Sequence, residues 1–204
     1  MKIIYGTKNK AKLQDMRRIL KGLDLEIIAL ADTGVTLPDV DESGNDPLKN
    51  AEIKAMAYYK ILKSPVFSCD TGLFIVGLDE KLQPGVHVRR VNDVYMSDDE
   101  MIDYYSKLAG TFSGTCKARY RNAICLIADE KNIFSYSGDD ISGEQFILSP
   151  FRHKTQREGY PLDSISINMK SGKCFMEMED EEFSSEYTEG FKKFFEMVLK
   201  QYTK

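Results

Sequence analysis

The stretch that decides the fold is Ile3-Ile4-Tyr5-Gly6-Thr7-Lys8-Asn9-Lys10-Ala11-Lys12. Its first three residues are apolar and end at a glycine, which predicts a short buried strand. From Leu13 onward, apolar residues recur at the three- and four-residue spacing of a helix with one buried face, and Gly22 closes that pattern. The chain is therefore predicted to begin with a strand, a turn and a helix, a unit from which α/β proteins are built.

The rest of the chain alternates helices and strands at first and then favours paired strands, which predicts an α/β fold with a mixed sheet. Pro47 suits a first helical turn, and Ser97 with Glu100 has the spacing of a capping box. The other elements expected are helices at 47–62, 97–108 and 187–202, and strands at 26–30, 66–69, 74–78, 115–128, 131–137 and within 162–178.

Composition excludes several classes of protein. The net charge of −4, from 28 basic and 32 acidic side chains, argues against a nucleic-acid coat, and no apolar run approaches the ~18 residues of a membrane span. The two histidines and four cysteines have no zinc-site spacing, so we expect reduced thiols and no zinc. These counts predict one domain over residues 1–204, located in the cytoplasm, with no nucleic-acid or membrane partner.

Charge is strongly segregated along the chain. Residues 1–21 carry seven basic side chains and one acid, whereas residues 38–46 carry four acids and no base. Free N–H groups at a helix start attract phosphate, so the lysine-rich turn is predicted to bind a polyphosphate. The acidic loop and Asp70, at the expected end of strand 66–69, could hold Mg²⁺. The alternative for each run is a solvated surface, which is how we interpret the seven acids of 177–189.

Five motifs follow one another over residues 3–128. They are Thr7-x-Asn9-x-x-Lys12; Asp41-Glu42-Ser43-Gly44 followed by Asn50-Ala51-Glu52-Ile53-Lys54-Ala55; Asp70-Thr71-Gly72-Leu73; Pro84-Gly85-Val86 with Arg89 and Arg90; and Ala118-Arg119-Tyr120-Arg121-Asn122-Ala123. In type and order they resemble the motifs of the Ham1/inosine triphosphatase family, the non-canonical purine nucleoside triphosphate pyrophosphatases.

The resemblance implies an elongated mixed β-sheet with flanking helices, two lobes around a central cleft, and a homodimer. It also implies that water attacks the α-phosphorus of a nucleoside triphosphate such as ITP, dITP or XTP, giving a monophosphate and pyrophosphate with Mg²⁺ as cofactor. Catalytic roles fall on Asp70 and Lys12, and metal binding on Asp70 with Asp41 or Glu42. Substrate binding falls on Thr7, Asn9, Lys12, Lys54, Thr71 (through its hydroxyl or N–H), Arg89 and Tyr160.

The last third of the chain departs from the family pattern. An interrupted Gly159-Tyr160-Pro161-Leu162-Asp163 stands for the family's G-F-G-[YW]-D-P segment, with Tyr160 placed to stack on a base. Phe183 and Tyr187-Thr188-Glu189 stand where the family has a lysine and Ser-His-Arg that embrace the base. Three alternatives therefore stay open: the same fold with shifted nucleotide specificity, a catalytically weak nucleotide-binding or regulatory protein, and an α/β interaction protein with fortuitous matches.

Overall fold

The computed structural model describes residues 1–36, 40, 44–91, 94–179, 182 and 185–202. The chain divides into two compact units. Unit 1 comprises Met1–Thr71, Arg121–Ser142 and Glu186–Lys204, and unit 2 comprises Gly72–Tyr120 and Gly143–Ser185. Each unit is thus assembled from segments that are far apart in the sequence.

Helices and strands alternate through the first half of the chain, as expected. The helices are α1 (Lys10–Ile19), α2 (Pro47–Leu62), α3 (Asp98–Gly110) and α4 (Ser185–Tyr202). The strands are β1 (Lys2–Tyr5), β2 (Glu26–Ala29), β3 (Val66–Ile75), β4 (Arg90–Val91), β5 (Val94–Tyr95), β6 (Cys116–Ile127), β7 (Ile133–Tyr136), β8 (Gln145–Leu148) and β9 (Ser166–Asn168). Short 3-10 turns are η1 (Leu30–Thr33), η2 (Glu80–Leu82), η3 (Asp139–Ile141), η4 (Pro161–Ile165) and η5 (Phe175–Glu177).

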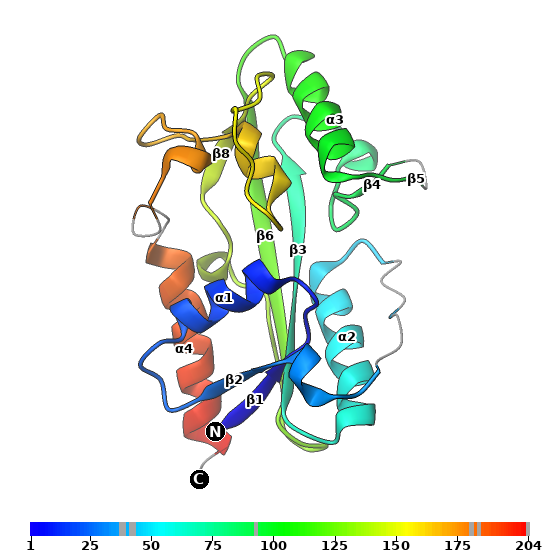
Figure 1. Cartoon of the computed structure of the whole chain (residues 1–204), viewed down its shortest axis with the longest axis vertical. Coiled ribbons are helices and arrows are strands. Elements are labelled where there is room, and N and C mark those ends of the chain that lie inside the picture. Colours follow the sequence, from blue (N-terminus) through cyan, green and yellow to red (C-terminus); the bar gives the residue numbers. More distant parts are fainter. Residues whose placement is uncertain (37–39, 41–43, 92–93, 180–181, 183–184, 203–204) are drawn as a thin grey trace. The chain divides into compact units, whose positions relative to one another are not determined.

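Unit 1 packs helices on both faces of its strands. Strand β1 runs parallel to β2 and to β3, with Tyr5 opposite Phe67, and β6 pairs antiparallel with β7. Helices α1 and α4 lie on one side of these strands and α2 on the other (Figure 1). Buried residues form one apolar cluster with α1 and α4 and another with α2. The two faces of β3 therefore meet different helices.

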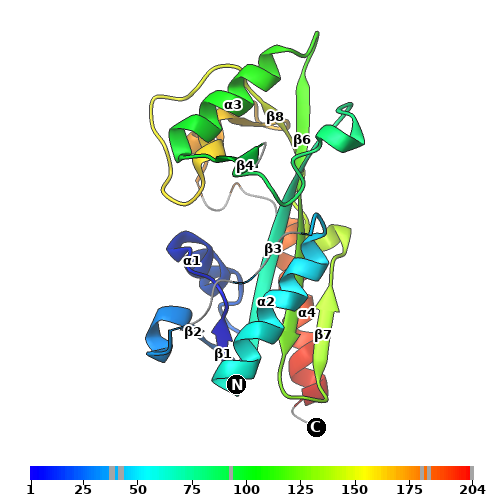
Figure 2. The same ribbon diagram turned by 90° about the vertical axis from the view of Figure 1, so that its right-hand side faces the viewer.

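Unit 2 is built on antiparallel pairing. Strand β6 pairs with β8 and β8 with β9, while β4 and β5 form a separate two-stranded sheet. Helix α3 packs with η4 and β8 (Figure 2). The core of this unit includes the buried side chains of Tyr105 and Phe146. The sheet order β2-β1-β3-β6-β8-β9, with β7 paired to β6, contains both parallel and antiparallel neighbours. This confirms the predicted mixed α/β sheet.

The predicted helices are confirmed with small differences at their ends. Helix α2 has the expected bounds, and its N-cap is Asp46, whose carboxylate accepts from the backbone N–H groups of the first turn. The capping box of Ser97 and Glu100 at the start of α3 is present. No helix in the described part of the chain is long and apolar enough to cross a membrane.

One strand prediction was wrong in a way that affects the site. Residues 66–69 and 74–78 were expected as two strands, but β3 is continuous from Val66 to Ile75, so Asp70 lies inside a strand. Gly72 suggests a turn in the sequence, yet it serves a close backbone approach. Leu73 and Gly85 exchange two backbone hydrogen bonds of 2.8 and 3.0 Å, and a Cβ at residue 72 would lie 3.2 Å from the Gly85 carbonyl carbon.

The expected strands within 162–178 are mostly replaced by turns. Only β9 is a strand there among the described residues, and η4 occupies residues 161–165. Because Pro161 has no N–H to donate to a strand ladder, it suits the first position of this short helical turn.

Candidate functional site

The start of α1 is capped by the side chain of the residue that precedes the helix. Asn9 is the N-cap residue, and its Oδ1 accepts from the backbone N–H groups of Ala11 (2.9 Å) and Lys12 (3.2 Å). The expectation of free N–H groups at this helix start was therefore wrong for these two donors. Asparagine is among the preferred N-cap residues because its short side chain reaches these groups. An anion here would meet the helix dipole and the polar side chains.

Thr7 is held in the turn between β1 and α1. Its N–H donates to the carbonyl of Tyr5 (2.8 Å), and its Oγ1 accepts from the N–H of Asn9 (3.2 Å). The preceding Gly6 donates to the carbonyl of Phe67 (2.7 Å), which fastens the turn to β3. Thr7 and Asn9 of the Thr7-x-Asn9-x-x-Lys12 motif therefore lie in a hydrogen-bonded turn near the start of β3, and Lys12 lies in the first turn of α1.

Asp70 and Lys54 form an ion pair. The Nζ of Lys54, on α2, lies 3.9 Å from Oδ1 of Asp70, on β3, and each side chain is only 14% exposed. Both residues were predicted for the site, from motifs that stand apart in the sequence. Two half-desolvated charges interact more strongly than a pair on the surface, and each needs the other's compensation.

The pKa of the neighbouring Cys69 thiol depends on burial and on nearby charges. Burial raises the pKa of its thiol to about 12, a hydrogen bond with Tyr5 and the charges of Lys12 and Lys54 lower it, and Asp70 raises it. The charges of Lys12 on α1, Lys54 on α2 and Asp70 on β3 therefore all act on the Cys69 thiol. Of these predicted residues, Lys54 and Asp70 form a direct ion pair.

Thr71 is engaged on the strand next to its own. Its Oγ1 donates to Oδ1 of Asn122 on β6 (2.9 Å), and the Nδ2 of Asn122 donates to the carbonyl of Ile141 (2.8 Å). Neighbouring side chains of a strand point to opposite faces. Thr71 therefore stands on the other face of β3 from Asp70, although both belong to one motif.

The acidic loop is described only in part. Asp41 and Glu42, predicted as metal ligands, lie outside the described residues. Asp46 caps α2, and the buried Asn50 donates through Nδ2 to the carbonyl of Gly44 (3.2 Å). Among the described residues, no group of three or more His, Cys, Asp and Glu side chains could hold a metal ion. Asp70 is thus the single predicted metal ligand that the structure describes.

Two predicted substrate-binding residues belong to unit 2. Arg89 lies 2.5 Å from the carboxylate of Asp98, donates to the carbonyl of Met96 (3.3 Å), and stacks near the ring of Tyr95. Tyr160 is half-buried and precedes η4. Arg89 is thus part of an ion pair at the start of α3, and any substrate contact would compete with that pair.

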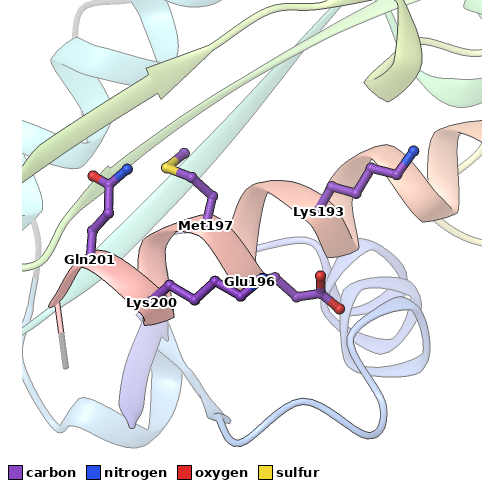
Figure 3. Close-up of a pocket in the computed structure, with 5 residues that line it drawn as sticks. All are labelled: Lys193, Glu196, Met197, Lys200 and Gln201. Carbon is purple, nitrogen blue, oxygen red and sulfur yellow. The ribbon is translucent and has the colours of Figure 1, made fainter. Parts of the chain in front are cut away.

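A surface depression of about 380 Å³ is separate from these residues. It is lined by side chains of one helix, α4 (Figure 3): Lys193, Glu196, Met197, Lys200 and Gln201. None of the predicted site residues lines it. Since a single helix surface supplies all its walls, we do not assign it to the candidate site.

Sequence reasoning missed three polar residues near the site, of which Asn50 and Ser68 are buried and Asn122 is half-buried. Asn122 and Asn50 stand inside the quoted motifs but had been given no role. Ser68 is fully buried two residues before Asp70, and its Oγ has no hydrogen-bond partner within the described part of the chain. A polar residue within an apolar strand pattern is the signal that could have pointed to Asn122 and Ser68.

The fold and the site define a class of protein: a mixed-sheet α/β protein that pairs a lysine of α2 with a carboxylate of β3 and carries a second lysine in the first turn of α1. A model of the Ham1 family matches residues 3–192, and the chain belongs to this family. It is 28% identical over 208 residues to a dITP/XTP pyrophosphatase of Thermoanaerobacter pseudethanolicus, an alignment that covers 98% of each chain.

Solved structures agree with this assignment at the level of the fold. A HAM1 protein from Coxiella burnetii superimposes with a TM-score of 0.76 at 22% identity, covering 97% of this chain and 99% of that one. The Ham1 protein of Staphylococcus aureus gives a TM-score of 0.74 at 20% identity, with the same coverage. The family resemblance inferred from the motifs is therefore confirmed.

Proposed function

We propose that the chain is a nucleoside triphosphate pyrophosphatase that hydrolyses ITP, dITP and XTP to the monophosphate and pyrophosphate. Family membership and the dITP/XTP pyrophosphatases among its relatives support this proposal. The single observation that carries it is the ion pair of Lys54 and Asp70, in which each side chain is only 14% exposed. Phosphoryl chemistry needs cations for the phosphates and a carboxylate at the reacting centre.

In this proposal, Lys12 and Lys54 bind the phosphates that leave as pyrophosphate, and Thr7 and Asn9 orient them. The Oδ1 of Asn9 already caps α1, so Asn9 would meet a phosphate oxygen through its Nδ2 hydrogens. Asp70 orients the attacking water or holds the metal ion.

We further propose Mg²⁺ as the cofactor, held by Asp70 together with Asp41 or Glu42. Mg²⁺ usually takes one or two carboxylates and fills its remaining positions with water and substrate phosphates. The carboxylate of Asp70 is of the kind that this ion binds. When bound, the ion would neutralise the negative charge that develops on the phosphates. Loss of pyrophosphate release in EDTA, and its return with added Mg²⁺, would test the cofactor.

Arg89 and Tyr160 stay predictions for substrate contacts, and we propose them as weaker members of the binding set. We also propose that residues 1–204 act as one pyrophosphatase domain, as a homodimer in the cytoplasm. The family resemblance supports these points. Molar mass in solution, measured by light scattering, tests the dimer.

A second candidate is the same reaction with a different nucleotide preference. Tyr187 stands in the region where the family pattern has base-reading residues, and here its ring packs edge-on against Phe191 in the core of unit 1 (5.9 Å between centroids). A side chain used for packing is not free to read a base. This observation favours a base site that differs from that of the relatives.

The test is a panel of nucleoside triphosphates with Mg²⁺, assayed for pyrophosphate. Release from ITP, dITP and XTP far above ATP and GTP supports the main proposal, and another order supports shifted specificity. Asp70→Asn should lose about two or more orders of magnitude in kcat, while Asp103→Asn, which changes an exposed carboxylate of α3, should not. Binding without turnover of any nucleotide would reject the enzyme and leave a nucleotide-binding protein.

A further inference from the structure

A chain of hydrogen bonds leads from β3 through β6 to the short turn η3, which packs against α4. Thr71 donates to Asn122 (2.9 Å), which donates in turn to the carbonyl of Ile141 (2.8 Å), within η3. The backbone N–H of Asn122 also donates to Oγ of Ser142 (3.2 Å). Asn122 therefore has contacts to two other segments of unit 1, residue 71 on one side and residues 141–142 on the other.

These contacts determine where the hydroxyl proton of Thr71 lies. The carbonyl of Ile141 can only accept, so the amide nitrogen of Asn122 must face it. The amide oxygen of Asn122 then faces Thr71, and since that oxygen can only accept, the Thr71 hydroxyl must be the donor. With its proton committed, Thr71 Oγ1 can serve a substrate or water only as an acceptor.

The far end of this hydrogen-bond chain is closely packed against α4. A Cβ at Gly190, on α4, would fall on the carbonyl oxygen of Asp140, so the helix backbone lies directly against η3. Ser142 donates from Oγ to the carbonyl of Gly138 (3.4 Å), across the same turn. Asn122 thus connects Thr71 to a closely packed part of unit 1.

We propose that Asn122 is a positioning residue for β3, the strand that carries Asp70 and Thr71. By holding the proton of the Thr71 hydroxyl, it fixes residue 71 on one face of β3 and thereby the direction of the Asp70 carboxylate on the other. This inference rests on the proposed pyrophosphatase function, because it assigns Asn122 a part in that reaction.

Three variants test the proposal in the full chain, with pyrophosphate release from ITP as the readout. Asn122→Ala removes both side-chain hydrogen bonds, and Thr71→Val removes the hydroxyl while keeping the shape of the side chain. Each should lower kcat about 10- to 100-fold, as loss of an orienting partner does, with KM changed less than about threefold. Thr71→Ser keeps the hydroxyl and should retain most of the wild-type kcat.

The double variant separates positioning from an independent effect. Because Asn122 acts through Thr71, combining Thr71→Val with Asn122→Ala should lower kcat little further than the worse single variant. The matched control is Asn132→Ala, which removes another half-buried asparagine of unit 1 that donates to the carboxylate of Asp129 (2.9 and 2.8 Å) in the β6–β7 turn. The control should keep the wild-type kcat.

The outcomes are distinguishable. Wild-type protein that releases no pyrophosphate from any nucleotide overturns the proposed function and the positioning role with it. Active wild type with full kcat in Thr71→Val or Asn122→Ala overturns the positioning role alone. So do losses of the two single variants that multiply in the double variant, or an equal loss in Asn132→Ala. If Asn122→Ala does not fold, Thr71→Val against Thr71→Ser still decides.

Discussion

Gly6, directly after β1, packs closely against the side chains of Ser68 and Tyr58, and Gly6→Ala is a sharp test of that packing. A Cβ at residue 6 would fall on Oγ of the buried Ser68 and lie 2.7 Å from Cδ2 of Tyr58. Gly6 does not have a positive φ, so the effect of this substitution comes from contact and not from backbone strain. Because Thr7 follows directly, the same contact decides where the turn that we propose to bind substrate begins.

The expected loss of stability is moderate. Adding a methyl group to a closely packed site costs about 1–3 kcal/mol. Replacing glycine by alanine also removes freedom from the unfolded chain, which returns about 0.4–1 kcal/mol. The net destabilisation of Gly6→Ala is therefore about 1–2 kcal/mol. With a urea m-value of about 2 kcal/mol per molar, the unfolding midpoint falls by about 0.5–1 M.

The partner of the contact provides the control. Ser68→Ala removes the hydroxyl that the new Cβ would meet, and alone it should be close to neutral because that hydroxyl has no hydrogen-bond partner among the described residues. In the double variant, the destabilisation by Gly6→Ala should shrink by about 0.5–1 kcal/mol, and the contact with Tyr58 should keep the remainder. Wild-type stability in Gly6→Ala, or no relief by Ser68→Ala, would refute the reasoning.

Two further predictions concern the charged site. Asn9→Asp should keep the stability of wild type, because aspartate caps a helix as well as asparagine, but should raise KM for the nucleotide about tenfold or more through repulsion of phosphate; unchanged KM would separate Asn9 from substrate binding. Burial raises the pKa of Cys69 to about 12, so its thiolate is scarce up to about pH 10. Iodoacetamide at pH 8.5 should label Cys69 slowly in the folded chain and rapidly in urea, as followed by peptide mass spectrometry; equal rates would contradict this.

Local sequence signals predicted the elements whose causes are local. The bounds of α2 follow from Pro47 and the apolar face of the helix, and the start of α3 follows from Ser97 and Glu100. The continuity of β3 was missed because it depends on residues far along the chain. The approach of Gly85 to Gly72 and the pairing of β3 within the sheet keep the strand extended where Asp-Thr-Gly suggests a turn.

The candidate site shows the same division. The motifs named Lys12, Lys54 and Asp70 as site residues, and the structure pairs Lys54 with Asp70. They did not predict that the amide oxygen of Asn9 caps the helix, since the sequence does not show to which acceptor a backbone N–H will donate. The hydrogen-bond partner of Thr71 could not be predicted either, because Asn122 is 51 residues away in the sequence, on another strand.

The continuity of β3 changes what the Asp70-Thr71-Gly72-Leu73 motif can do. At a strand end, Asp70 and Thr71 could both turn toward one ligand, whereas within a strand they point to opposite faces. Asp70 then meets Lys54 of α2, and Thr71 meets Asn122 of β6. A change of charge at Asp70 therefore acts on the face of β3 that contacts α2, whereas a change of hydrogen bonding at Thr71 acts on the opposite face. For this reason Asp70→Asn should act on the chemical step directly, and Thr71→Val should act on it only through the strand that carries the carboxylate.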